Sequence, residues 1–239
     1  MWWGVGGGGQ DGRVRFVVIR HAQSANNLLW AQTGTSAGRH HDPELTELGH
    51  TQAKRLAEAV ADGVLPWRIT HVHTSLMTRA VQTATPLADV LDLPLLGHME
   101  AHEIGGVFIE DDEGVRTPHP GAAAEQLMAA STRLVLPPGA GPDGWYTKPY
   151  EGEGSDARAR ALVAGLREQH GDDDVVALLT HGAFFQHLFR ALLGIDGMTG
   201  WVTKHNTAIS LFEDQPEHGS VSARAVDWMP HLTPDLVSE

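Results

Sequence analysis

Short runs of β-branched and apolar residues alternate along this chain with longer segments of helical periodicity, and this alternation restricts the fold more than any other feature. Residues 13–19 (RVRFVVI), 68–75 (RITHVHTS) and 175–179 (VVALL) are rich in Val and Ile and too short for stable helices, so we predict strands there. Strands that alternate with helices form a mainly parallel sheet whose two faces the helices cover.

Helical segments separate the predicted strands. Residues 46–63 place their apolar side chains at helical spacing, with Thr46 as N-cap and Gly63 just beyond the end. Three further helices are predicted at 76–93, 155–170 and 180–194. We therefore expect an α/β fold, a three-layer α/β/α sandwich with a mainly parallel sheet. A chain of 239 residues fits one domain, which we place at 13–239.

Charged and titratable residues stand where two predicted strands end. Arg20 and His21 follow the first strand, and His181 and Gly182 follow the run at 175–179. In parallel sheets, ligands bind at the carboxyl ends of the strands, so these residues are predicted to meet in one pocket. Arg79 begins a helix after another strand and is predicted to join them.

This combination suits a phosphoryl group. Two guanidiniums offer planar, permanently charged donors that can each bind two oxygens. A neutral imidazole can attack phosphorus, and a second imidazole can donate to a phosphoryl oxygen.

Composition excludes several other classes of function. The chain has 17 Lys and Arg against 30 Asp and Glu, a formal net charge of −13, which disfavours nucleic acid and anionic membranes. It contains no cysteine, so thiol catalysis and disulfides are excluded. We see no signal peptide or membrane span and expect a soluble cytoplasmic protein. Residues 1–12 are predicted to be a flexible Gly-rich N-terminal tail.

The region 104–154 differs from the rest because it is rich in Gly and Pro. We predict a lid-like insertion there, with one short helix around 122–133. Phe108, Trp145 and Tyr146 are its candidates for substrate contact.

Four ordered motifs in this chain resemble those of the histidine phosphatase superfamily, the phosphoglycerate mutase-like proteins. The family's Arg-His-Gly-x-Ser-x-x-Asn is similar to RHAQSANN, residues 20–27, which puts Asn27 in the asparagine place. DPELTELGHTQA at 42–53 and SLMTRAVQTA at 75–84 match two further motifs, and His181-Gly182 matches the second histidine. The resemblance spans roughly residues 14–212 and implies the phosphoglycerate mutase-like fold.

The resemblance also implies a chemistry that needs no metal or other cofactor. His21 would be the nucleophile that forms a phosphohistidine, and His181 would assist it. Arg20, Asn27, Arg79 and Gly182 would hold the phosphoryl oxygens. The family's proton donor is a glutamate in the context Glu-x-x-x-Gly. Glu103 in MEAHEIGGVF is assigned that role, with Glu100 as the alternative.

The chain departs from the family pattern at two places. Ala22 replaces the glycine after the nucleophile, and a left-handed backbone there would cost an alanine about 1 kcal/mol. The family's Gly-Glu-Ser before the late helix has no clean counterpart in EGEGSDAR. This departure leaves the roles of Glu153 and Ser155 open.

Fifteen histidines also raise the alternative of a metal site. The pairs that could chelate are His40 with His41, His71 with His73, and His98 with His102. No sequence motif supplies a third ligand to any pair, so we predict no metal site and interpret these histidines as scattered polar residues.

The predicted substrate is a small-molecule phosphate monoester. The acidic EDDEG at 110–114 favours an ester with a neutral or apolar remainder. We therefore predict a metal-independent phosphatase. Two alternatives remain: phosphoryl transfer of the phosphoglycerate mutase type, and a catalytically weak phosphate-binding protein. A homo-oligomer is also compatible with the sequence.

Overall fold

The computed structural model describes residues 13–111 and 113–239; the predicted N-terminal tail lies outside these residues. The strands and helices of the first half are β1 (Arg15–Arg20), α1 (Ala25–Thr33), α2 (Glu47–Ala61), β2 (His71–Ser75), α3 (Thr78–Leu91), β3 (Leu95–His98) and the short helix η1 (Met99–Ala101). Those of the second half are β4 (Phe108–Glu110), β5 (Arg116–Pro118), α4 (Ala124–Ala130), β6 (Leu134–Val135), α5 (Ser155–Gln169), β7 (Val175–Thr180), α6 (Gly182–Leu193), β8 (Ile209–Gln215), η2 (Pro216–His218), β9 (Ser220–Trp228) and η3 (Pro234–Leu236).

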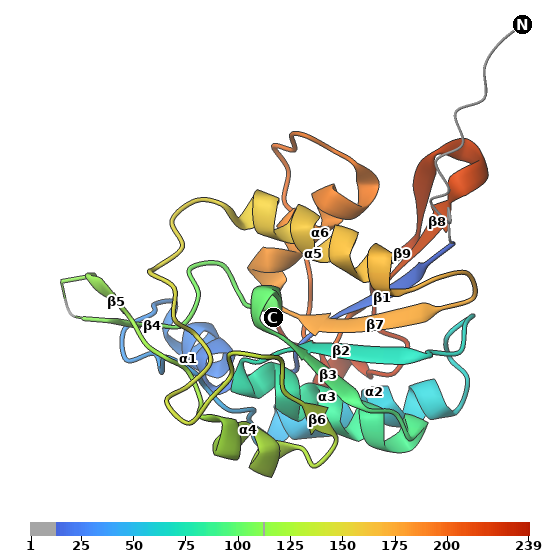
Figure 1. Ribbon diagram of the computed structural model, residues 1–239. Coiled ribbons are helices and arrows are strands. Elements are labelled where there is room, and N and C mark those ends of the chain that lie inside the picture. The colour runs from blue at the N-terminus through green and yellow to red at the C-terminus, as the bar shows by residue number, and fades with distance from the viewer. Residues whose placement is uncertain (1–12, 112) are drawn as a thin grey trace, which may run out of the picture.

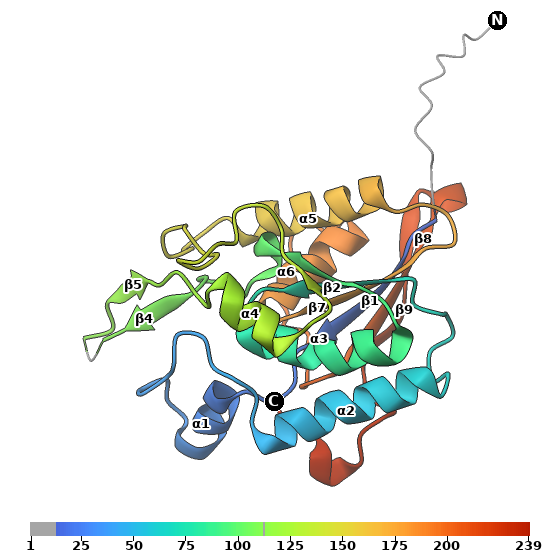
Figure 2. The same ribbon diagram turned by 60° about the horizontal axis from the view of Figure 1, so that its bottom comes forward.

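A seven-stranded sheet forms the middle layer, with the strand order β6-β3-β2-β7-β1-β8-β9. The first five of these strands are parallel to one another, whereas β8 and β9 run antiparallel at one edge. Helices α2 and α3 cover one face of the sheet and α5 and α6 cover the other (Figures 1 and 2). The predicted three-layer α/β/α sandwich with a mainly parallel sheet is therefore confirmed.

Alternating side chains of the central strands supply two separate cores. Val17 and Ile19 of β1 join the cluster under α2 and α3, while Phe16 and Val18 join the cluster under α5 and α6. Successive side chains of a strand point to opposite faces, so a continuous apolar run is what a strand buried on both faces requires. This pattern explains why the apolar run around β1 was a reliable strand signal.

The region 104–154 is more regular than the sequence predicted. It contains the antiparallel pair β4 and β5, the helix α4, and β6, which pairs with β3 at the edge of the main sheet. Trp145 is fully buried and Tyr146 is 4% exposed, both within the core cluster under α3. The prediction that these two side chains contact substrate is therefore wrong, because they anchor the segment to the domain.

Two local expectations were tested directly. Thr46 caps α2 as predicted, since its hydroxyl accepts a hydrogen bond from Gly49 N at 3.0 Å. Among the described residues, no helix has the length and apolar composition needed to cross a membrane.

Candidate active site

Three neighbouring strands bring the predicted site residues to the same edge of the sheet. In the parallel pairing of β1 with β7, Arg20 lies opposite Thr180, so His21 and His181 follow at the same level. The amide of His21 donates to the carbonyl of Thr180 at 2.8 Å, which locks the two strand ends together. The rings of His21 and His181 lie with their centroids 5.1 Å apart.

His21 is held in one tautomer. Its Nδ1 lies 2.7 Å from the carbonyl oxygen of Ala22, which can only accept, so Nδ1 carries the proton and Nε2 keeps its lone pair. The ring is 3% exposed, and burial, followed by the charges of Arg79 and Arg20, lowers its pKa well below the usual value. The imidazole is therefore neutral at pH 7 and presents Nε2 as a nucleophilic nitrogen.

Arg79 contacts that nitrogen directly. Its Nε donates to Nε2 of His21 at 3.1 Å from the first turn of α3, and its side chain is 7% exposed. An oxyanion placed at Nε2 would find the guanidinium already beside it. Arg79 is thus arranged to exchange this contact for one to a phosphoryl oxygen.

The predicted residues Arg20, His21, Asn27, Arg79 and Glu103 all line one pocket of about 190 Å³. Two of them are permanent cations, which makes the pocket a local positive site in an acidic protein. Within the part of the chain that the structure describes, the buried Nε of Arg20 has no hydrogen-bond partner. Buried donors without a partner are uncommon, and an anion in the pocket would satisfy this one.

Asn27 is positioned by the start of α1. Ser24 is the N-cap of this helix, and Asn27 Oδ1 accepts hydrogen bonds from Ser24 N at 3.1 Å and Ser24 Oγ at 2.9 Å. This capping box leaves the Asn27 amide nitrogen free of these contacts and available as a donor toward the pocket.

His181 and Gly182 contact pocket residues without lining the pocket themselves. Nε2 of His181 lies 2.8 Å from Ser75 Oγ at the end of β2. Its Nδ1 is buried without a partner among the described residues. Burial, followed by the charge of Arg79, lowers the pKa of His181 well below its usual value. A Cβ at position 182 would lie 3.1 Å from Arg20 Nε, so the glycine lets that guanidinium lie close to the helix start.

Glu103 lines the pocket and caps α6. Its Oε1 accepts from the amides of Phe184 at 2.7 Å and Ile104 at 2.9 Å, and its Oε2 accepts from Ala183 N at 3.1 Å. A carboxylate at a helix N-terminus is stabilised by these amides and by the helix dipole. Because Glu103 takes the amides of Ala183 and Phe184, these two amides of α6 are not available to a phosphoryl group. The alternative proton donor Glu100 instead pairs with Lys148 at 2.7 Å.

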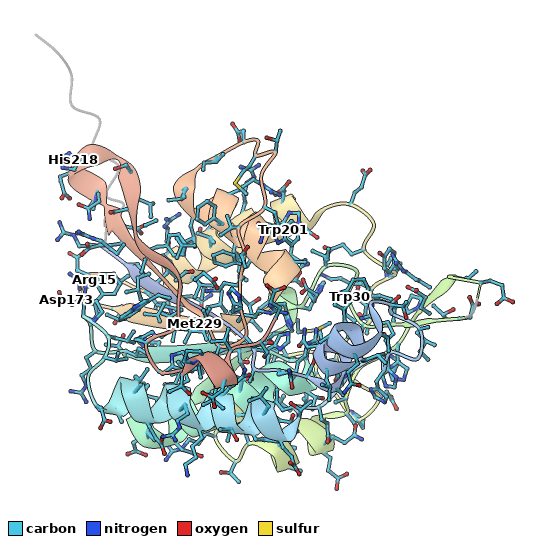
Figure 3. The ribbon with its side chains drawn as sticks, turned by 180° about the vertical axis from the view of Figure 1, so that it is seen from behind. Arg15, Trp30, Asp173, Trp201, His218 and Met229 are labelled. Carbon is cyan, nitrogen blue, oxygen red and sulfur yellow. The ribbon has the colours of Figure 1, made fainter. Side chains whose placement is uncertain are left out.

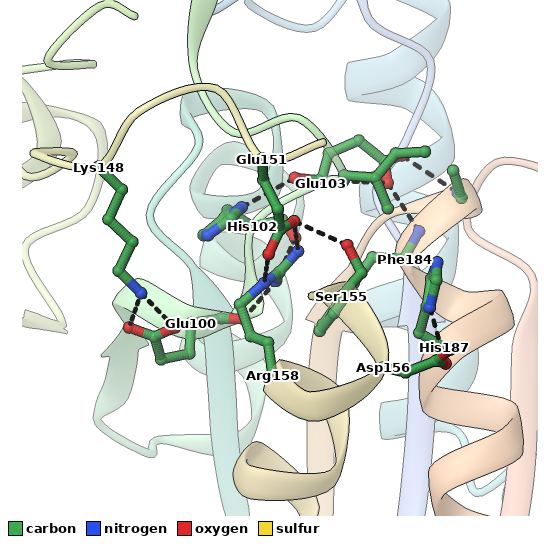
Figure 4. Close-up of polar contacts among 12 residues, drawn as sticks. Glu100, His102, Glu103, Lys148, Glu151, Ser155, Asp156, Arg158, Phe184 and His187 are labelled. Carbon is green, nitrogen blue, oxygen red and sulfur yellow. Dashed lines mark hydrogen bonds and ion pairs between the residues drawn. The ribbon is translucent and has the colours of Figure 1, made fainter. Parts of the chain in front are cut away.

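A buried network holds Glu103 in place (Figure 4). Arg158 of α5 donates to both carboxylate oxygens of Glu151, at 2.8 and 2.6 Å, and to the carbonyls of Glu100 and His102, at 2.7 and 2.9 Å. Ser155 Oγ donates to Glu151 at 2.7 Å.

This network shows which acidic residue pairs with Ser155 in place of the glutamate of the family's Gly-Glu-Ser segment. Glu151, four residues before Ser155, is the acidic partner of that serine, whereas Glu153 is exposed. The sequence analysis missed Glu151 and Arg158 because the acidic residue is displaced along the chain.

Ala22 does not strain the site. It is absent from the described non-glycine residues with positive φ, so the cost of a left-handed alanine does not arise. Its amide donates to Thr83 Oγ1 at 3.0 Å, which ties the loop after β1 to α3.

Arg39 is a third cation in the pocket lining that the sequence analysis missed. Its guanidinium carbon lies 4.4 Å from the centre of the Phe108 ring, and its buried Nε has no partner among the described residues. Burial lowers its pKa from the usual value, with a smaller opposite effect from Glu110. No motif surrounds Arg39, so only the folding of the segment after α1 reveals its place.

A larger neighbouring cavity of about 790 Å³ is lined by His40, His41, Asp42 and His119 among others, but by no lysine or arginine. A phosphoryl dianion needs compensating charge, so the smaller pocket around His21 is the better candidate active site despite its size.

Comparisons with known proteins found similarities to a family model, to curated relatives and to solved structures. A model of the histidine phosphatase superfamily (branch 1) matches residues 16–227. Phosphoserine phosphatase 1 of Hydrogenobacter thermophilus is 24% identical over 196 residues, which cover 79% of this chain and 80% of that relative. The 2,3-bisphosphoglycerate-dependent phosphoglycerate mutase 1 of Latilactobacillus sakei is 36% identical over 79 residues, 33% of this chain. The chain spans only 31% of that mutase's length.

A solved structure shows the same fold over nearly the whole chain. The phosphoserine phosphatase from Entamoeba histolytica, in complex with 3-phosphoglyceric acid, superposes with a TM-score of 0.57 at 20% identity. The match covers 92% of this chain and 100% of that one.

Proposed function

Because this chain belongs to the histidine phosphatase superfamily (branch 1), we propose that it hydrolyses a small-molecule phosphate monoester through a phosphohistidine on His21, without a metal ion. The observation that carries this proposal is the state of His21. The Ala22 carbonyl holds its Nδ1 proton, burial keeps the ring neutral, and Nε2 faces a pocket lined by arginines.

In the first step, His21 Nε2 attacks phosphorus and forms the N–P bond while the bond from phosphorus to the ester oxygen breaks. Arg20 and Arg79 compensate the negative charge on the phosphoryl oxygens, and the Asn27 amide donates a further hydrogen bond. The contact from Arg79 Nε to His21 Nε2 passes to a phosphoryl oxygen as the nitrogen becomes bonded to phosphorus.

Glu103 takes up a proton when the anionic ester binds beside it, and then supplies the proton that the leaving oxygen needs. Oε1 accepts two amide hydrogen bonds, whereas Oε2 accepts one, so Oε2 keeps the capacity to carry a proton. In the second step, a water attacks phosphorus, Glu103 takes its proton, and the N–P bond breaks to release phosphate and restore His21.

His181 acts on the phosphoryl group from the strand beside His21. Its Nε2 lies 2.8 Å from Ser75 Oγ, and its unpartnered Nδ1 can donate to a phosphoryl oxygen when a bound dianion raises the proton affinity of the ring. Ser75 thereby fixes the orientation of this imidazole. Ser75 could have been found from the sequence, because it is the first residue of the motif SLMTRAVQTA.

The position of Arg39 supports an ester whose remainder carries an anionic group, in place of the neutral or apolar remainder predicted from residues 110–114. Glu110 of that segment is paired with Arg116 at 2.7 Å, so part of its acidic charge is compensated. Arg39 has no carboxylate partner among the described ion pairs and can meet a carboxylate of the substrate.

The experiment that tests this function measures hydrolysis of an activated aryl phosphate and of esters with carboxylate-bearing and neutral remainders. Wild-type protein and His21→Ala are compared, each with and without a strong chelator. We expect wild-type activity that survives chelation, loss of activity by about 10³-fold or more in the variant, and preference for the carboxylate-bearing esters.

Each alternative has its own outcome in this assay. Phosphate binding without hydrolysis would favour the catalytically weak binding protein. The hypothesis of a phosphoglycerate mutase rests on the 79 residues that are 36% identical to the Latilactobacillus sakei mutase. An acceptor that speeds turnover and receives the phosphoryl group would support this hypothesis.

A further inference from the structure

Histidines that the sequence shows only as pairs are brought together at the opposite end of the sheet from the pocket. His71 begins β2, His170 follows the end of α5, and Asp174 immediately precedes β7. Figure 3 shows Asp173, the neighbour of Asp174, at one edge of the molecule and far from Trp30, a residue of the pocket lining. This cluster therefore takes no part in the proposed phosphatase chemistry.

The Nδ1 atom of each histidine lies close to the Asp174 carboxylate, each beside a different oxygen. Nδ1 of His71 lies 3.6 Å from Oδ1 of Asp174, and Nδ1 of His170 lies 3.6 Å from Oδ2 of the same carboxylate. These distances are too long for hydrogen bonds. Zn²⁺ binds imidazole nitrogen at about 2.0–2.1 Å, which puts two tetrahedral ligand atoms about 3.4 Å apart. One donor atom from each of the three residues lies within 4.8 Å of the other two.

Two further histidines support the cluster from behind. Nε2 of His170 lies 3.0 Å from Nε2 of His73, and Nδ1 of His73 lies 2.8 Å from Nε2 of His98. If His170 donates its Nε2 proton to His73, and His73 donates its Nδ1 proton to His98, then His170 Nδ1 keeps its lone pair toward Asp174. A metal-ligating histidine characteristically donates its other ring N–H in this way.

We propose that His71, His170 and Asp174 form a binding site for a divalent transition-metal ion of the Zn²⁺ class, with His73 and His98 orienting the His170 ring. Two nitrogens and one carboxylate oxygen suit Zn²⁺, whereas Mg²⁺ and Ca²⁺ prefer oxygen ligands alone. A fourth position is left for water, since all three side chains are partly exposed. The group is the one candidate among the described residues with three convergent ligands.

An ion bound here would link two segments of the fold. It joins the start of β2 to the turn between α5 and β7, and these strands are neighbours in the sheet. A ligand that binds only the folded state stabilises it by mass action. At a metal concentration of about 100 times Kd, we expect Tm to rise by about 5–10 °C for a chain of this size.

The test uses the untagged full chain, stripped with chelator and dialysed, and titrated with Zn²⁺ by calorimetry. We expect one high-affinity ion per chain and the rise in Tm. Co²⁺ should give the intense visible absorption of a tetrahedral site. His170→Gln and His71→Gln should each weaken Zn²⁺ binding by about 100-fold or more. Loss of a residue that only hydrogen-bonds to a metal ligand already weakens metal binding by about 10–100-fold.

The matched control is His41→Gln. His41 also lies beside another histidine, with its ring centroid 3.6 Å from that of His119, but it is not part of the group of three convergent ligands. This variant should keep both the affinity and the Tm shift. If His170→Gln fails to fold, His71→Gln decides the question, because its ring is partly exposed.

Three outcomes would overturn the proposal. They are no saturable binding by the wild-type chain, equal loss of binding in His41→Gln, and unchanged binding in the folded variants of His170 and His71. Phosphatase activity of the stripped wild-type protein is measured in parallel and should be retained.

Discussion

At the scale of single residues, the proposed chemistry depends on two atoms: the His21 Nε2 that would attack phosphorus, and the Glu103 Oε2 that would carry the proton. The sequence predicted His21, Arg79 and Glu103 because each stands in a motif at the end of a strand or the start of a helix. It could not predict that Glu103 also caps α6, because that contact joins residues about 80 positions apart. Arg39 was not predicted because no motif surrounds it in the sequence.

The dual role of Glu103 predicts a specific kinetic signature. Glu103→Gln keeps an oxygen that can accept amide hydrogen bonds but cannot transfer a proton. The variant should hydrolyse an ester with a poor, alkoxide-like leaving group about 10²–10⁴-fold more slowly, and an activated aryl ester with a much smaller loss. Rates on the two esters are compared directly. Glu100→Gln is the matched control and should retain both rates; equal losses for both esters in Glu103→Gln would remove it from the acid role.

At the scale of elements, prediction succeeded for the central strands of the sheet and missed the strands toward its two edges. β1 and β7 are continuous apolar runs, so their identity was evident from the sequence. β9 (SVSARAVDW) is largely exposed at the sheet edge, and its pairing with β8 determines its role. β3 is only four residues long and includes Gly97. No strand was predicted for β3, β8 or β9.

Helix α5 supports the site through Arg158, which donates to the carbonyls of Glu100 and His102. The Arg158–Glu151 ion pair is buried, with side chains 6% and 15% exposed, and its loss leaves an uncompensated buried carboxylate. Arg158→Met should therefore lower the free energy of unfolding by about 3–5 kcal/mol. The variant should also lower kcat. Arg158 holds the backbone carbonyls of Glu100 and His102, and His102 directly precedes Glu103 in the chain.

Urea denaturation measures the first effect and aryl phosphate hydrolysis the second. Lys148→Ala is the control, since it removes an exposed ion pair to the same Glu100 and should cost less than about 1 kcal/mol. The double variant with Glu151→Gln should recover part of the lost stability. A loss in Arg158→Met no larger than in Lys148→Ala would contradict the assigned role.

At the scale of the whole molecule, the buried histidines couple stability to pH. Burial lowers the pKa of His231 to about 4 and, with the charge of Arg158 as the next cause, that of His102 to about 4. His21 and His181 are also lowered, mainly by burial. In the unfolded chain these groups bind protons near pH 6.5, so between about pH 6.5 and 4 the unfolded state binds more protons than the folded state.

The free energy of unfolding should therefore fall as pH decreases below about 6.5, by up to about 1.4 kcal/mol per pH unit for each such histidine. Urea denaturation at pH 7.5, 6.5 and 5.5 measures it. Replacing His231 by Gln should reduce the slope by the share of one histidine. A free energy that stays constant or increases between pH 7.5 and 5.5 would show that these side chains are accessible to protons in the folded protein.

The proposed mechanism passes a phosphoryl group through His21, so this phosphohistidine can be trapped. Protein mixed with substrate is quenched in alkali within the first turnover, because phosphohistidine survives there, and the modified peptide is identified by mass spectrometry. We expect one phosphoryl group per chain on the peptide that contains His21, and none in His21→Ala. In His181→Ala, the phosphoryl group should form on His21 more slowly than in the wild-type protein. Substrate turnover by wild-type protein with no phosphoryl group on His21, or with the group on another residue, would contradict it.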